Sequence, residues 1–140
     1  MNAFTWAILT ALIWGMVPLI EKSGLDKVTP VTGLFFRSIG VLLGLVFLSI
    51  FMVDYNQIKS ADLKSVLLLV LGGFLASIVA QMFFYQGLKI GQVSKMVPLS
   101  GTYPLVAFLL GAVIFRESIT PLKVLGVSLI SLGVWALHFN

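Results

Sequence analysis

An arginine inside a long apolar segment is the residue of this sequence best placed to do chemistry. Arg37 lies seven residues after Pro30, where that segment begins. A charged side chain at membrane depth costs several kcal/mol, so it needs a partner or a polar cavity. Two interpretations stay open. Arg37 is either a fixed positive charge lining a substrate path, or a structural cation paired with Glu21 or Asp26.

A second polar group follows one helical face of a later apolar segment. Gln81 and Tyr85 are four residues apart, and they share this face with Ser77 and Leu88. An amide and a hydroxyl at membrane depth can hydrogen-bond to another helix or to a ligand. Both roles stay open, and we predict that Gln81 and Tyr85 bind a ligand.

The next apolar segment contains two prolines six residues apart, in the order Pro98-Leu-Ser-Gly-Thr-Tyr-Pro104. Each proline lacks a backbone donor, and Gly101 lies between them, so the pattern predicts a kink or an unwound turn. Carbonyls freed at membrane depth are tolerated only where they are buried or line a water-filled cavity. The predicted ligand-binding residues of this segment and of the first apolar segment are Pro98, Thr102, Tyr103, Pro104 and Trp14.

The sequence shows no pattern of catalytic or metal-binding residues. It contains no cysteine, which excludes disulfides and thiolate chemistry. Its acids lie at the edges of apolar segments, and no histidine is paired with acids and no hydroxyl with a base. We therefore predict no catalytic residue, no metal and no cofactor, and a protein that is not an enzyme.

Membrane-spanning helices must position these groups. Hydrophobic residues make up 59 % of the 140 residues and charged residues only 10 %, too few charges to cover a soluble domain. The apolar runs of about 18 to 25 residues can cross the roughly 30 Å hydrocarbon layer as helices. They also lack the alternation of barrel strands. We predict an all-α, polytopic transmembrane bundle, with residues 1–140 forming a single domain.

Five spans are predicted, joined by short polar loops. They cover about residues 3–20, 30–53, 65–88, 96–115 and 121–139. Glu21 and Lys22 are expected to end the first span, and Trp14-Gly15 and Pro18 to break it near that end. The formal charge of +4 gathers at the ends of spans, which is typical of membrane flanks and not of nucleic-acid binding.

The lysines and arginines of the loops do not favour one orientation. With five crossings the two termini lie on opposite sides of the membrane. The N-terminal side carries four cations, Lys59, Lys64, Arg116 and Lys123. The other side also carries four, Lys22, Lys27, Lys89 and Lys95. Since loop cations set orientation, the chain is expected either to insert both ways and pair as an inverted dimer, or to be oriented by the insertion machinery.

Several motifs in this order resemble one EamA repeat of the drug/metabolite transporter superfamily, over nearly the whole chain. The matching elements of the first three spans are Trp14-Gly15 with Lys22, Arg37, and Phe84–Lys89 with Val93-Ser94. Those of the last two are Pro98, Pro104, Phe115–Glu117, Thr120, Gly126 and Gly133. Arg116 departs from the pattern, because a glycine is common before this glutamate.

The resemblance implies a multi-pass carrier of a small organic metabolite or drug-like solute in the cell (inner or plasma) membrane, working by alternating access. Most relatives carry two repeats in ten helices, the second inverted, whereas this sequence carries one. Its expected partners are the lipid bilayer, a small-molecule substrate, and an antiparallel second copy or a homologous five-helix subunit. Arg37 would supply positive potential, while Trp14 and Tyr103 would pack against an apolar or ring-bearing substrate.

Three alternatives stay open. The small multidrug resistance carriers are similar in size but depend on an acid in the first helix, and residues 3–20 contain none. Some EamA-like small proteins move lipid-linked sugars, which a groove open to lipid would favour. A non-transporting membrane scaffold needs neither an intramembrane arginine nor a broken helix.

Overall fold

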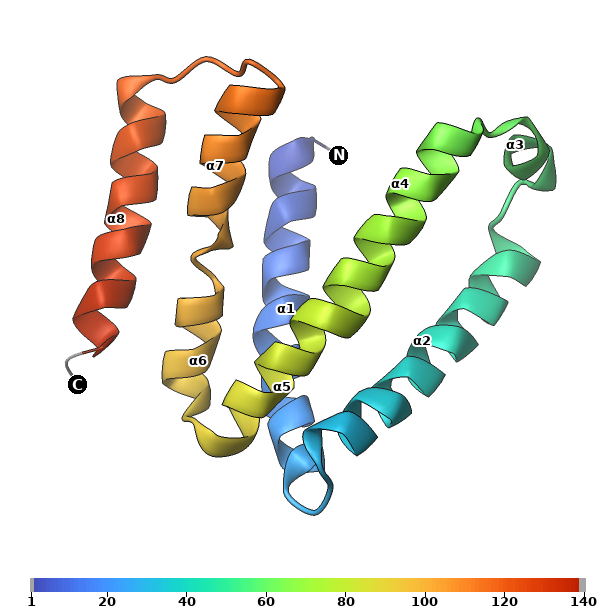
Figure 1. Ribbon diagram of the computed structural model, residues 1–140, viewed down its shortest axis with the longest axis horizontal. Coiled ribbons are helices and arrows are strands. Elements are labelled where there is room, and N and C mark those ends of the chain that lie inside the picture. Colours follow the sequence, from blue (N-terminus) through green and yellow to red (C-terminus); the bar gives the residue numbers. More distant parts are fainter. Residues whose placement is uncertain (1, 139–140) are drawn as a thin grey trace. The chain divides into compact units, whose positions relative to one another are not determined.

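The computed structural model describes residues 2–138, and every regular element in that part of the chain is helical (Figure 1). The elements are α1 (Ala3–Leu25), α2 (Pro30–Phe51), α3 (Tyr55–Ser60), α4 (Leu63–Phe74), η1 (Leu75–Ala80), α5 (Gln81–Ile90), α6 (Val93–Ser100), α7 (Tyr103–Ile114) and α8 (Pro121–His138). The prediction of an all-α membrane bundle is confirmed.

Among residues 2–138, four helical segments are long and apolar enough to cross a membrane. They are Ala3–Leu25, Pro30–Phe51, Leu63–Ile90 and Val93–Ile114. The fifth predicted span corresponds to α8, which has 18 residues and is therefore about 27 Å long. This length is slightly below the thickness of the hydrocarbon layer, so a full crossing by α8 stays a prediction. Residue 139, where the span was predicted to end, lies outside the described residues.

The described chain divides into two compact units. One consists of Leu19–Ile90 and contains the end of α1 with α2 to α5. The other consists of residues 2–18 and 91–138, in which α8 packs against α6 and α7. Within the first unit α2 packs against α5, and it diverges from α4 toward α3 in Figure 1.

The helix that carries the first predicted span continues beyond the predicted end of that span. Glu21 and Lys22 do not stop the helix, because α1 continues to Leu25. Nor do Trp14-Gly15 and Pro18 break it, since Pro18 lies inside a continuous helix. A membrane helix tolerates proline when other groups satisfy the freed backbone. Both charged residues have polar partners on other helices of the same unit, so neither has to leave the helix for water.

The longest polar stretch forms the short helix α3, and an aspartate caps the start of α3 and of the following helix α4. The Asp54 side chain accepts a hydrogen bond from the backbone N–H of Asn56 at the start of α3. The Asp62 side chain accepts from the N–H of Ser65 at 2.9 Å and caps α4. Hydrogen bonds from the side chain and the backbone of Ser65 hold the pKa of Asp62 below its ordinary value.

The third long helix contains a π-helical segment that the sequence pattern did not predict. Leu63–Ile90 is one continuous run, with α4 and α5 joined through η1. A π segment widens the turn by one residue, so its hydrogen bonds run between residues five apart. η1 contains neither glycine nor proline, and this explains why no local signal pointed to it.

The predicted break in the fourth span is confirmed. α6 ends at Ser100 and α7 begins at Tyr103, with a turn at Gly101 and Thr102. The N–H of Gly101 donates to the carbonyl of Val97 at 2.9 Å. A Cβ on Gly101 would lie 3.1 Å from the Pro98 carbonyl oxygen, so this tight turn favours glycine.

The connection after α7 explains why a glycine is common where this chain has Arg116. Arg116 follows the helix cap at Phe115 and has a φ of 52°, in the left-handed region. Glycine adopts this conformation freely, whereas an L-residue with a Cβ is strained there by roughly 1–2 kcal/mol. The loop therefore keeps the backbone path of a glycine although the residue is arginine.

We expect Arg116→Gly to raise the free energy of unfolding by about 0.5–1 kcal/mol, because it removes this strain at some entropic cost in the unfolded chain. Arg116→Ala keeps a Cβ and is the matched control, with no gain expected. Equilibrium unfolding in mixed detergent micelles, followed by tryptophan fluorescence, measures both. Equal stabilisation by alanine and glycine would contradict the strain at this position.

Candidate functional site

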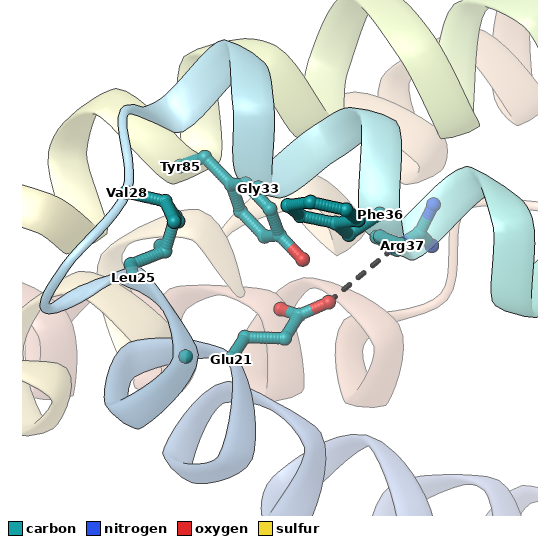
Figure 2. Close-up of a pocket in the computed structure, with 8 residues that line it drawn as sticks. Glu21, Leu25, Val28, Gly33, Phe36, Arg37 and Tyr85 are labelled. Carbon is teal, nitrogen blue, oxygen red and sulfur yellow. Dashed lines mark ion pairs between the residues drawn. The ribbon is translucent and has the colours of Figure 1, made fainter.

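A carboxylate joins three helices of the unit Leu19–Ile90. Glu21 of α1 lies with its Oε1 atom 3.3 Å from Nε of Arg37 on α2. Nε2 of Gln81, the first residue of α5, donates to both oxygens of Glu21 at 3.3 Å. Figure 2 shows the hydroxyl of Tyr85 pointing toward the same carboxylate. We call Glu21, Arg37, Gln81 and Tyr85 the Glu21 cluster.

The ion pair at the centre of this cluster is largely removed from solvent. The side chains of Glu21 and Arg37 are 12 % and 28 % exposed. Removing one partner of an ion pair costs about 3–5 kcal/mol when the pair is fully buried, because the other charge is left uncompensated, and the cost is smaller for a partly exposed pair such as this one. Each of the two charged groups therefore stabilises the other in its position between the helices.

Arg37 also connects the cluster to the π-helical segment. Its Nη1 atom donates to the carbonyl oxygen of Ser77 in η1 at 3.5 Å. The guanidinium thus bridges a carboxylate on α1 and a backbone group on the third long helix. π-Helical turns occur often at functional sites, where they redirect side chains. Here the turn immediately precedes Gln81, which binds Glu21.

The helices that carry the cluster approach most closely at a glycine. A Cβ on Gly33 of α2 would lie 2.5 Å from Cδ2 of Leu25 and 3.4 Å from the ring of Tyr85. Leu25 and Tyr85 are each only 2 % exposed, so a side chain added at Gly33 would have to displace packed groups. Gly33 therefore lets α2 come close to the end of α1 and to α5. At Gly40 and Gly44, by contrast, an added Cβ would meet no described atom within 4 Å.

The ion pair lines a cavity of about 360 Å³ in this unit (Figure 2). Its polar walls come from Glu21, Arg37 and Tyr85, and its other walls are apolar or small. The lining residues are Glu21, Gly24, Leu25, Val28, Gly33, Phe36, Arg37 and Tyr85. A cavity with mainly apolar walls and a few convergent polar groups is the usual form of a small-molecule site.

Two lysines join the helix ends beside this cavity by capping each other's helices. Nζ of Lys22 on α1 donates to the carbonyls of Leu88 and Lys89 at the end of α5. Nζ of Lys89 donates in turn to the carbonyl of Leu25, which ends α1, and to those of Asp26 and Val28 in the loop that follows. Helix C-termini carry unpaired carbonyls and partial negative charge, which cations satisfy. The two caps thereby hold α1 and α5 together at this end.

Three of the predicted binding residues come together in the structure. Arg37, Gln81 and Tyr85 all belong to the Glu21 cluster. Two of the three, Gln81 and Tyr85, come from the helical face predicted from the sequence. Ser77, which was predicted to share that face, contacts Arg37 through its backbone carbonyl and not its side chain.

The other predicted residues belong to the second unit. Trp14 lies on α1 with its side chain exposed, and Pro98 lies inside α6. The hydroxyl of Thr102 donates to the Leu99 carbonyl at 2.7 Å. Tyr103 and Pro104 open α7. A binding role for each of these five residues stays a prediction, as it does for the three residues in the cluster.

Sequence reasoning missed Glu21 as a site residue. It was assigned to the end of the first span, although pairing with Arg37 was one of the two interpretations kept open. The spacing of Pro18, Glu21 and Leu25, three and four residues apart, could have placed Glu21 on one face of a helix that continues past residue 20, since no glycine or proline lies between Pro18 and Gly24.

Among residues 2–138, no three His, Cys, Asp or Glu side chains gather in a group able to hold a metal.

Long apolar helices around a partly buried ion pair define a multi-pass membrane protein with an internal polar site. A comparison of the sequence with known protein families identifies the class of membrane protein. The EamA-like transporter family matches residues 1–139, and the chain belongs to this family of membrane transporters.

Two relatives align with the chain along most of its length. An uncharacterized transporter of Archaeoglobus fulgidus is 24 % identical over 132 residues, which cover 94 % of this chain and 46 % of the relative. An uncharacterized protein of Methanocaldococcus jannaschii is 24 % identical over 139 residues, which cover 99 % of this chain and 98 % of the relative. The chain thus spans about half of the first relative. No solved structure matches it.

We expect Gly33→Val to destabilise the chain by about 1–3 kcal/mol, because its side chain overfills the contact with Leu25 and Tyr85. Gly40→Val is the matched control on the same helix, since an added Cβ there meets no described atom. Thermal unfolding in detergent, followed by tryptophan fluorescence, compares the two. If both variants unfold at the same temperature, the close approach of α2 and α5 at Gly33 is wrong.

Proposed function

We propose that this chain forms part of a carrier that moves a small organic solute across a cell membrane by alternating access. The observation that carries the proposal is the Glu21 cluster, in which an ion pair and the Tyr85 side chain line a cavity between apolar helices and the Gln81 amide binds the carboxylate of that pair. Membership of the EamA-like transporter family supports it. In this role Gln81 and Tyr85 hydrogen-bond the solute, and the protein performs no covalent chemistry.

The helix irregularities support the same mechanism. Many carriers build their solute sites from discontinuous helices near the middle of the bilayer. This chain has a break between α6 and α7 and a π segment between α4 and α5. Pro98, Thr102, Tyr103 and Pro104 at the break, with Trp14, are proposed as further solute contacts. Each unit would contribute its own irregular helix to the transport cycle.

We also propose that the carrier is assembled from two inverted copies of this fold, either two copies of this chain or this chain with a homologous five-helix subunit. The equal number of loop cations on the two sides supports dual insertion. The Archaeoglobus relative is about twice as long as its aligned region, which leaves room for a second repeat in one polypeptide. An inverted pair is the arrangement on which many carriers base alternating access.

Tyr85→Phe tests the solute site by removing a single hydroxyl. We expect it to slow solute efflux about 2- to 10-fold, the effect of losing one hydrogen bond of ~0.5–1.5 kcal/mol. The assay uses proteoliposomes loaded with a defined mixture of polar metabolites and follows their efflux by mass spectrometry.

Tyr55→Phe is the matched control for this experiment. The Tyr55 hydroxyl binds the Ser49 carbonyl at 2.9 Å, at the α3 end of α2, and efflux should be unchanged. If Tyr85→Phe leaves efflux unchanged, Tyr85 has no role in transport. If the unmodified chain moves none of the metabolites, the carrier proposal fails and a lipid-linked substrate or a scaffold role becomes the better explanation.

Reporters fused to the two termini test the inverted pair. We expect each terminus on both sides of the membrane, because four cations on each side leave the orientation unspecified. Asn56→Lys, Gln57→Lys and Ser60→Lys together add three cations to the exposed loop around α3 and should give a single orientation. A wholly one-sided result for the unmodified chain would exclude the antiparallel homodimer and favour a homologous partner.

A further inference from the structure

We propose that the site selects an uncharged, ring-bearing solute, because the charge of Arg37 is already matched inside the cavity. This inference rests on the proposed carrier function and concerns the chemical class of its substrate. It replaces the expectation that Arg37 presents an unbalanced positive charge to a ligand. Glu21 thereby becomes a residue that determines specificity, in addition to its role in packing.

The charges that line the cavity sum to zero. Glu21 and Arg37 are its two charged lining residues, and their closest atoms are 3.3 Å apart. The Glu21 carboxylate also accepts from Gln81, and the guanidinium also donates to the Ser77 carbonyl. Both charged groups are therefore engaged with protein partners at the place where a solute would bind.

Lys22 and Lys89 do not change this balance inside the cavity. Neither Lys22 nor Lys89 lines it, and each has its ammonium group on helix-end carbonyls. Those bonds offset the partial negative charge at the ends of α1 and α5. The lysines therefore serve the helix ends, and a solute in the cavity meets the ion pair alone.

A charged solute would have to break this pair. An anion can bind the guanidinium fully only if Glu21 releases it, and a cation can bind the carboxylate fully only if Arg37 does. Either exchange leaves one protein charge unpaired in a site with little access to water, which is strongly unfavourable. An uncharged amide or hydroxyl can instead hydrogen-bond to the outer lone pairs and N–H groups of the intact pair.

The remaining walls indicate what the rest of the solute is like. Leu25, Val28 and Phe36 give the cavity apolar sides, and the rings of Phe36 and Tyr85 face it in Figure 2. Aromatic rings pack well against other flat, apolar groups. The chemistry of the site therefore fits a solute with a ring at one end and an uncharged hydrogen-bonding group at the other.

Three indole compounds that share a ring and differ in charge test this inference: indole-3-acetamide (neutral), indole-3-acetate (negative) and tryptamine (positive). Equilibrium dialysis of each labelled compound against the purified full chain in nanodiscs at neutral pH gives the affinities. We expect the amide to bind at least about tenfold more tightly than either charged compound, a difference of ~1.4 kcal/mol.

Removing one charge at a time should change the order of affinities. Glu21→Gln is expected to make the acetate the best ligand, and Arg37→Gln to do the same for tryptamine. Glu21→Gln with Arg37→Gln removes both charges, leaves neither unpaired, and should keep the preference for the amide. Glu117→Gln is the matched control, because it removes one partner of the exposed ion pair between Glu117 and Lys123 outside the cavity.

Several results would overturn the inference: preference of the unmodified chain for a charged compound, no binding of any of the three, or an unchanged order in Glu21→Gln. If the single variants do not fold, the variant with both Glu21→Gln and Arg37→Gln decides. Tighter binding of a charged compound to this folded double variant overturns the inference, and tighter binding of the amide supports it. The efflux assay reports separately on carrier function, since a chain that binds the amide but moves no metabolite keeps the specificity and loses the transport role.

Discussion

The ion pair between Glu21 and Arg37 is the interaction on which the arrangement of the unit Leu19–Ile90 depends. Two opposite charges at 3.3 Å, with little exposure to solvent, are acceptable in an apolar bundle only while they stay together. This requirement fixes the end of α1 against α2. Gln81 on the same carboxylate and Ser77 on the guanidinium extend the constraint to the third long helix. One pair thus positions three helices.

Packing at Gly33 and the lysine caps at the helix ends also hold together the helices that carry this ion pair. Gly33 allows Tyr85 and Leu25 to approach α2, and this places the Tyr85 hydroxyl beside the carboxylate. The exchanged caps of Lys22 and Lys89 satisfy the carbonyls with which α1 and α5 end. These residues include the lysines by which the sequence resembles its family. Their contacts give the shared motifs a physical explanation: they hold together the helix ends next to the site.

The sequence predicted the features that depend on local composition. Long apolar runs gave the helical spans, and two prolines around a glycine gave the break between α6 and α7. The face with Ser77, Gln81 and Tyr85 also followed from helical spacing. The errors have a common cause. A hydropathy boundary marks where charged residues begin, but Glu21 and Lys22 lie inside α1 because they find partners there. The π segment has no local signal at all.

By itself, the sequence determined that this is a helical membrane protein and that Arg37 needs a partner or a polar cavity, because both conclusions follow from the free energy of placing residues in an apolar layer. Only the tertiary structure decided that the partner is Glu21 and not Asp26, that Gln81 binds the same carboxylate, and that the pair lines a cavity. The reason is that pairing and burial depend on distances between atoms that lie 16 to 60 residues apart in the chain, and only the packing of the helices sets those distances.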